Sequence, residues 1–128
     1  MSGTSLDGLD LADCTISVNN GSWDFVLNHG ITISYSKEIL ELLKLGVNLT
    51  DEQIEDLDRK LAELFAEACL TLDLAPTDCI ASHGHTIKHR PDLGYTLQIG
   101  NPKIIAKQTG KMSSHRLFAR LPHRFWHT

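Results

Sequence analysis

The sequence is poor in the features that mark secreted and membrane-embedded proteins. Its three cysteines, Cys14, Cys69 and Cys79, are odd in number and form no C-x-x-C pair. This usage indicates a reduced chain in which cysteine acts as a small apolar residue. No run of 18 apolar residues is present, and no basic segment followed by an apolar one opens the chain. We therefore expect a cytoplasmic protein with no membrane-spanning helix and no secretory signal.

Aromatic residues and positive charge are also scarce over most of the chain. Aromatic residues make up 6% of the 128 residues, which is thin for a platform that stacks nucleic-acid bases. All 16 acidic side chains lie within residues 1–110, together with 8 of the 12 basic ones. This acidic balance argues against nucleic acid and anionic membranes as partners.

Two common catalytic motifs are absent. Gly3 to Gly8 fits the first half of the phosphate-binding motif G-x-x-x-x-G-K-[ST], but Leu9 and Asp10 stand where Lys and Ser or Thr are required. The segment that follows also has the pattern of a strand, whereas this motif opens a helix, so a Walker A loop is excluded. No G-x-S-x-G elbow anchors a Ser/His/Asp hydrolase.

The opening stretch is nevertheless rich in groups that bind anions. Glycines allow sharp bends, and successive N–H groups in a bend form a concave anion site. Thr4 and Ser5 add hydroxyl donors, and Asp7 or Asp10 could hold a metal ion that accompanies a phosphate. A phosphate-binding turn and an ordinary polar turn at a flexible N-terminus both remain open from the residue types alone. The candidate residues are Gly3, Thr4, Ser5, Leu6, Asp7, Gly8, Leu9 and Asp10.

The next part of the chain predicts a hairpin and two helices. Residues 9–18 and 23–33 have strand-like patterns around the turn signal of residues 19–22. A short helix is expected over 36–45, with Ser36 as its N-cap. A longer amphipathic helix begins at Thr50, where Thr50-x-x-Gln53 fits a capping box, and Pro76 ends it. The opposite face of this helix, with Glu55, Asp58, Arg59 and Glu63, is interpreted as a solvated face.

Histidines gather after a short strand that we expect to be buried, at residues 79–82. His83, His85 and Thr86 follow its carboxyl end, where open α/β sheets place their ligands. The H-x-H-x-x-x-H spacing of His83, His85 and His89 could suggest zinc, but no cysteine or carboxylate lies close enough in sequence to complete a site. Histidines that face a ligand or are hydrogen-bonded are the alternative, and the metal ligands are left unknown.

A second hairpin and a third helix follow. Strands over 86–89 and 95–99 flank the turn of residues 90–94. Arg90, Gly94 and Gln98 could contact a sugar or phosphate, although their spacing alone favours a plain hairpin turn. Asn101 and Pro102 are typical of a helix start, and this helix runs towards Gly110. Residues 112–128 have no clean period and are expected to be a basic, disordered tail.

Three segments together resemble the anhydro-N-acetylmuramic acid kinase family. Met1-Ser2-Gly3-Thr4-Ser5-Leu6-Asp7-Gly8 resembles its phosphate-loop signature. Ser82-His83-Gly84-His85-Thr86, with His89-Arg90-Pro91, resembles its His-Gly-Gln-Thr segment and the His-Arg-Pro that follows. Tyr95-Thr96-Leu97-Gln98-Ile99-Gly100-Asn101 resembles its Thr-Leu-Gln-Ile-Gly-Asp. The order, the spacing and the helix between these motifs agree as well, over about residues 1–111.

The resemblance implies a fold, a reaction and ligands. The fold class is α/β, a partial ribonuclease-H-like, actin-type ATPase lobe over 1–111 with a mixed sheet, hairpins and helices. The reaction uses ATP, Mg²⁺ and water to open the 1,6-anhydro ring of the amino sugar and phosphorylate O6, a step in peptidoglycan recycling. The resemblance assigns Gly3 to Asp10 to the nucleotide phosphates, and His83, Thr86, Gln98 and Gly100 to the sugar. It also implies full-length members that pair as homodimers.

Departures from the family pattern shape the expectation for this chain. His85 stands where the family has Gln, and Asn101 stands where Asp is usual. The family places its general base far beyond Thr128 and an apolar strand before Met1. No catalytic residue is therefore assigned here, and we expect an inactive fragment whose residues 112–128 are translated out of frame. A non-catalytic phosphate- or sugar-binding module and a degraded-gene product are the alternatives.

Overall fold

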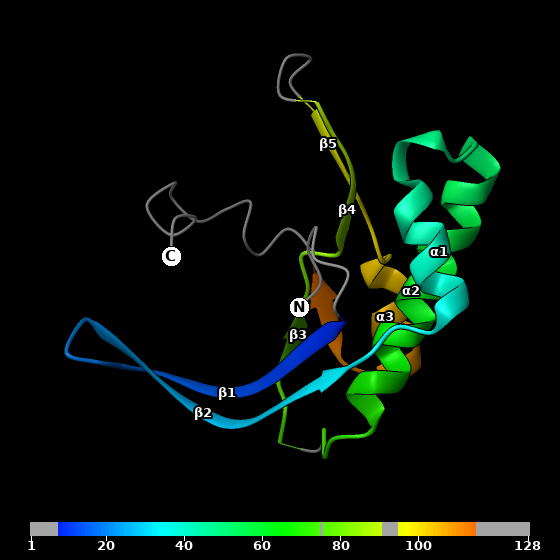
Figure 1. The fold of residues 1–128 in the computed structure, drawn as a ribbon. Coiled ribbons are helices and arrows are strands. Elements are labelled where there is room, and N and C mark those ends of the chain that lie inside the picture. The colour runs from blue at the N-terminus through cyan, green and yellow to red at the C-terminus, as the bar shows by residue number, and fades with distance from the viewer. Residues whose placement is uncertain (1–7, 75, 91–94, 115–128) are drawn as a thin grey trace.

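The protein, analysed as a computed structural model, has a mixed α/β fold built from small sheets and α-helices. The structure describes residues 8–74, 76–90 and 95–114. The elements in chain order are β1 Leu9–Asn19, β2 Ser22–Ile33, α1 Lys37–Leu45, the short 3₁₀ helix η1 Gly46–Asn48, α2 Asp51–Leu70, β3 Cys79–Ala81, β4 His85–Arg90, β5 Tyr95–Ile99, α3 Pro102–Thr109 and β6 Met112–Ser114. In Figure 1 the helices lie together, and the β1–β2 and β4–β5 hairpins extend away from them.

The strands pair as three two-stranded sheets among the described residues. β1 and β2 are antiparallel, β4 and β5 are antiparallel, and β3 and β6 are parallel. The first hairpin turns at Asn20 and Gly21, whose φ angles are 52° and 80°. Two consecutive positive φ angles are typical of the tight turn that matches the twist of a hairpin, so the predicted turn is confirmed.

Helix caps form where the sequence predicted them. The Ser36 Oγ accepts the backbone N–H of Ile39 at 3.2 Å at the start of α1. At α2, the Thr50 Oγ1 accepts the N–H of Gln53 at 3.2 Å, while the Gln53 Oε1 accepts the N–H of Thr50 at 2.9 Å. This reciprocal pair satisfies two backbone donors that have no partner within the helix.

The core is organised around α2. Leu57 and Leu61 from this helix are almost completely buried, together with Ile99 of β5 and Ile105 of α3. Leu9 at the start of β1 belongs to the same cluster. Both the end of the opening stretch and the β4–β5 hairpin are therefore held against one hydrophobic core.

Two elements, α2 and β3, differ from the sequence-based expectations. α2 ends at Leu70 and not near Pro76, because the Thr71 N–H and Oγ1–H both bond to the Ala68 carbonyl oxygen and tighten the last turn. β3 was expected to be buried, but Cys79 and Ala81 are exposed because this strand is paired only with β6 among the described strands.

The predicted tail also contains structure at its start. Met112–Ser114, which the sequence analysis assigned to the tail, forms β6 beside β3. A three-residue strand is too short to show a period in the sequence. Residues 115–128 lie outside the described part of the chain.

Candidate functional site

The opening stretch reaches the described structure at its last three residues, Gly8, Leu9 and Asp10. Gly8 is buried, with a φ angle of 156°, and a Cβ atom there would lie 2.6 Å from the Ile33 carbonyl oxygen. Only glycine leaves room for this close approach to the end of β2. The entry of the loop into β1 is therefore fixed by backbone packing. Residues 3–7 lie outside the described part of the chain, so their assignment to phosphate stays a prediction.

Leu9 and Asp10 face different surroundings. Leu9 is 4% exposed and belongs to the core, so only its backbone groups are available to a ligand. The Asp10 side chain is exposed and its Oδ1 accepts the hydroxyl of Thr32 at 2.6 Å. Carboxylate oxygens are ligands that Mg²⁺ prefers. The carboxylate of Asp10 is therefore chemically suited to bind a metal ion.

The four residues predicted to face the sugar lie near the base of the β4–β5 hairpin. Thr86 pairs directly with Gln98 across the two strands, so their side chains share a face of the hairpin. Gly100 is buried, and a Cβ atom there would lie 3.0 Å from Phe65 Cε2 and 3.6 Å from Gly84 Cα. This contact brings the end of β5 against the segment that holds His83. The structure therefore gathers these residues, while their role stays a prediction.

The two histidines at this place both have a lowered pKa, which favours the neutral imidazole. Burial lowers the pKa of His83, and burial together with the neighbouring His83 lowers the pKa of His85. A neutral imidazole offers one hydrogen-bond donor and one acceptor, which suits a sugar hydroxyl better than a phosphate anion. His85 is only 3% exposed, because it lies on the face of β4 that pairs with Ile99 and turns towards the core.

One residue of this region was misinterpreted from the sequence. Asp58 was assigned to the solvated face of α2, but its Oδ1 accepts the backbone N–H of Gly100 at 2.6 Å, across 42 positions of the chain. Gly100 has a positive φ angle of 104°, a backbone conformation that favours glycine, and this bond helps to hold it in place. The only sequence signal for it was the position of Asp58 beside the buried Leu57 of the same helix.

The rest of that face behaves as predicted. Arg59 forms ion pairs with Asp56 at 2.6 Å and with Glu63 at 3.3 Å, and all three side chains are substantially exposed. Hydrogen bonds from Lys60 and Arg59 lower the pKa of Asp56. Exposed pairs of this kind contribute little to stability, so this part of α2 is a solvated face.

A shallow hollow lies where α2 meets the start of α3. It has a volume of about 420 Å³, and Asp58 contributes to its wall. Its lining includes more carboxylates than cations, so the nucleotide phosphates predicted at Gly3 to Asp10 are not expected here. The lining residues are Glu52, Glu55, Asp56, Asp58, Arg59, Asn101 and Ile104.

The zinc alternative finds no support in the described residues. No group of three or more His, Cys, Asp or Glu side chains comes together there in a way that could hold a metal ion. The side chain of His89 lies outside the described part, as do the side chain of Arg90 and residue Gly94 of the other predicted contact. These two alternatives stay predictions.

The three cysteines differ in exposure. Cys69 is buried, and burial raises the pKa of its thiol, whereas Cys14 and Cys79 are exposed. The burial of Cys69 fits the expected use of cysteine as a small apolar residue. Among the described helices, none is long and apolar enough to cross a membrane.

Comparison with known proteins identifies the family. The family model described as anhydro-N-acetylmuramic acid kinase matches residues 1–116. A relative from Crocosphaera subtropica, named anhydro-N-acetylmuramic acid kinase, is 39% identical over 120 residues, which cover 86% of this chain and 31% of the relative. Relatives of the same name from Microcystis aeruginosa and Shewanella pealeana are 40% and 38% identical, over 85% and 86% of this chain.

The match covers only part of the length of the relatives. The chain spans about 31% of the length of the curated relatives from Crocosphaera subtropica and Microcystis aeruginosa. The matched region nevertheless includes both the opening stretch and the β4–β5 hairpin. Since the family model matches most of the chain, this protein belongs to the anhydro-N-acetylmuramic acid kinase family.

Proposed function

We propose that this chain forms the part of a carbohydrate kinase that binds nucleotide phosphates and an anhydro amino sugar. The observation that carries the proposal is the family match over residues 1–116, with relatives named anhydro-N-acetylmuramic acid kinase. The mixed α/β arrangement supports the finer assignment to a partial actin-type ATPase lobe. We include small molecules, and neither nucleic acid nor membrane, among the proposed partners, because residues 1–110 are acidic.

The proposed reaction breaks one bond of the sugar and forms two. Water adds to C1 as the C1–O6 bond of the 1,6-anhydro ring breaks, and O6 takes the γ-phosphoryl group of ATP, with ADP and a proton as the other products. Phosphoryl transfer depends chiefly on positioning and on neutralising charge at the phosphate oxygens. Mg²⁺ would supply part of that neutralisation when bound, and Asp10 is the described residue whose carboxylate could hold it.

The residues of this chain would bind and orient the two substrates. The backbone N–H groups of Gly3 to Asp10 would hold the phosphates, as the resemblance implies. Thr86 and Gln98 share one face of the β4–β5 hairpin and would bond to sugar hydroxyls, with the neutral His83 beside them. Gly100 would present its backbone, held by Asp58, to the same substrate.

A turnover assay on the 128-residue chain tests whether it is active alone. We expect no N-acetylmuramic acid 6-phosphate from ATP, Mg²⁺ and the anhydro sugar, because the resemblance assigns the general base to a part of the family that this chain does not span. Loss of such a base lowers a rate by about 10²–10⁴-fold. Product formation above that residual level would contradict the proposal that the chain is inactive alone.

Binding measurements separate the alternatives. Binding of ATP or the sugar by calorimetry, without turnover, would favour a non-catalytic module. Absence of a cooperative thermal transition would favour a degraded-gene product.

A chimera tests the family function directly. This chain's residues 1–110 would replace the matched part of the Shewanella pealeana relative, and we expect kinase activity. The variants Thr86→Ala and Gln98→Ala should raise KM for the sugar more than KM for ATP. Equal effects on both substrates would contradict their assignment to the sugar.

A further inference from the structure

The outer part of the β1–β2 hairpin exposes an apolar face that the proposed catalytic function does not use. Cross-strand pairs align its side chains as Val18 with Trp23, Ile16 with Phe25 and Cys14 with Leu27. Trp23 is 74% exposed and Phe25 is 75% exposed, while Ile16 is 64% exposed. We call these six residues, Cys14, Ile16, Val18, Trp23, Phe25 and Leu27, the apolar hairpin face.

A bulge in β2 gathers these side chains on one face. Asp13 pairs with His29 and Cys14 pairs with Leu27, so Asn28 is an extra residue in the ladder. Side chains alternate between the faces of a strand, and one extra residue reverses the alternation. Ile31 and Ile33 of β2 therefore pair with the inward-facing Leu11 and Leu9, whereas the part of β2 beyond Asn28 turns its large apolar residues outward.

The opposite face of the same hairpin segment has a different character. Thr15 and Ser17 lie there, and the Thr15 Oγ1 accepts a hydrogen bond from the Asn28 side-chain amide at 2.8 Å. Val26 is the one large apolar residue on that side of β2 in the segment. The hairpin is thus amphipathic, with a contiguous apolar face of the kind that marks an interaction site.

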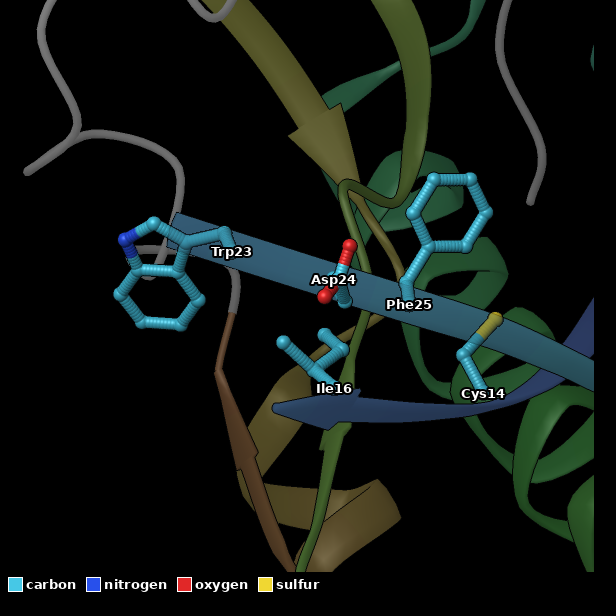
Figure 2. A pocket seen from close by; sticks show the side chains of 5 residues that line it. All are labelled: Cys14, Ile16, Trp23, Asp24 and Phe25. Carbon is cyan, nitrogen blue, oxygen red and sulfur yellow. The ribbon is translucent and has the colours of Figure 1, made fainter. Parts of the chain in front are cut away.

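The apolar hairpin face is also hollowed. A depression of about 260 Å³ is lined by Cys14, Ile16, Trp23 and Phe25 of this face, and by Asp24, which pairs with Ser17 of the opposite face. Figure 2 shows these side chains around it, with Cys14 and Ile16 from β1 and the other three from β2. Aromatic residues around a concave apolar site are typical anchors of protein interfaces, so a protruding apolar side chain would fit here.

The charge of the β1–β2 hairpin and the length of the relatives indicate what covers the apolar hairpin face. Residues 9–33 contain Asp10, Asp13 and Asp24 and no Lys or Arg. A second copy would bring the same carboxylates towards these, and like charges oppose docking. The relatives extend well beyond the part that this chain spans, since it covers about 31% of their length. We propose that the apolar hairpin face packs against an apolar segment, flanked by Lys or Arg, from that remaining part of the family polypeptide.

The test uses the remaining part of the Shewanella pealeana relative as a separate polypeptide. It is titrated into the 128-residue chain carrying Trp126→Phe, so that Trp23 is the only tryptophan of this chain. We expect Trp23 to become less accessible to acrylamide. The double variant Ile16→Thr/Phe25→Thr should weaken the association at least about tenfold, because aromatic anchors dominate interface energies. Val26→Thr, on the opposite face, is the matched control and should leave the association unchanged.

Two outcomes would overturn the proposal. One is association that is absent, or equally strong in the double variant and the control. The other is a dimer of this chain alone, seen by light scattering and abolished by the double variant, which would identify a second copy as the occupant. Should the separate polypeptide fail to fold, the chimera gives the same comparison. Trp23 must then be less accessible to acrylamide in the chimera than in the isolated chain. These readouts need no turnover, so the proposal can fail independently of the kinase function.

Discussion

A single carboxylate, Asp58, connects α2 to the place where β5 ends and α3 begins. Its hydrogen bond to the Gly100 N–H spans 42 positions of the sequence, and no local pattern announces it. Capping residues differ in this respect, because Ser36, Thr50 and Asn101 bond to partners two or three positions away. Sequence patterns predict such local bonds well. They miss contacts that only the packing of the chain creates.

The first prediction concerns this carboxylate. Asp58→Ala should lower the free energy of unfolding by about 1–3 kcal/mol, because it leaves a backbone N–H without its charged acceptor. Asp58→Asn should cost less, since its amide oxygen still accepts. Urea unfolding measures both. Glu55→Ala, on the exposed side of the same helix, is the control and should change stability by less than about 0.5 kcal/mol. Equal effects of Asp58→Ala and Glu55→Ala would contradict the role of Asp58.

The second prediction concerns Gly8. Gly8→Ala should destabilise the protein by about 1–3 kcal/mol, because the new Cβ atom would lie 2.6 Å from the Ile33 carbonyl oxygen. Gly30→Ala provides the comparison, since a Cβ atom there meets only the Leu11 carbonyl oxygen at 3.8 Å. The thermal unfolding temperature of Gly8→Ala should therefore be clearly lower than that of Gly30→Ala. A Gly8→Ala protein as stable as Gly30→Ala would show that the close approach to β2 does not constrain the loop.

At the scale of the elements, the sequence predicted which helices and strands form better than it predicted where they end or how exposed they are. Both hairpins, the two longer helices and α3 form where the patterns placed them. The end of α2 was missed, because bonds from Thr71 to the Ala68 carbonyl close the helix before Pro76 can. The exposure of β3 was missed as well, since a run such as Cys79-Ile80-Ala81 indicates a strand but not which neighbours cover it.

The third prediction concerns the start of α2. Thr50→Ala should lower the free energy of unfolding by about 1 kcal/mol, because the N–H of Gln53 loses its acceptor and the capping box is broken. Thr50→Ser keeps a hydroxyl at the same place and should recover most of that loss. Urea unfolding followed by circular dichroism provides the measurement. If Thr50→Ser were as unstable as Thr50→Ala, the methyl group of Thr50 would matter more than its hydroxyl.

At the scale of the whole molecule, one core holds both candidate binding segments. Leu9 follows the opening stretch directly, and Ile99 precedes Gly100, and both are buried in the cluster around α2. Family motifs identified these two segments in the sequence. Their attachment to a common core could not be predicted, because it depends on how α2 packs against strands from opposite ends of the chain. The outward-facing hairpin was equally hidden, since its apolar face results from a bulge at Asn28.

The buried histidines make the stability of the whole molecule depend on pH. Burial lowers the pKa of His83 and His85 in the folded state. Unfolded histidine has its ordinary pKa of about 6.5, so the unfolded chain takes up protons at a higher pH than the folded one. Stability is therefore full above about pH 6.5 and is lost as the pH falls towards the folded pKa values. Carboxylates such as Asp56, whose pKa is lowered from 3.8, act only at lower pH.

The last prediction follows from this loss of stability at lower pH. Urea unfolding midpoints should fall steadily from pH 7.5 to pH 5.5, and His85→Gln should flatten this dependence because Gln carries no titrating group. Gly30→Ala, on the exposed hairpin, changes no titrating group and is the control that should keep the wild-type slope. His85→Gln also restores the residue that the family resemblance expects at this position. A slope that His85→Gln leaves unchanged would mean that other groups set the pH dependence, and that His85 accepts a proton as readily in the folded chain as in the unfolded one.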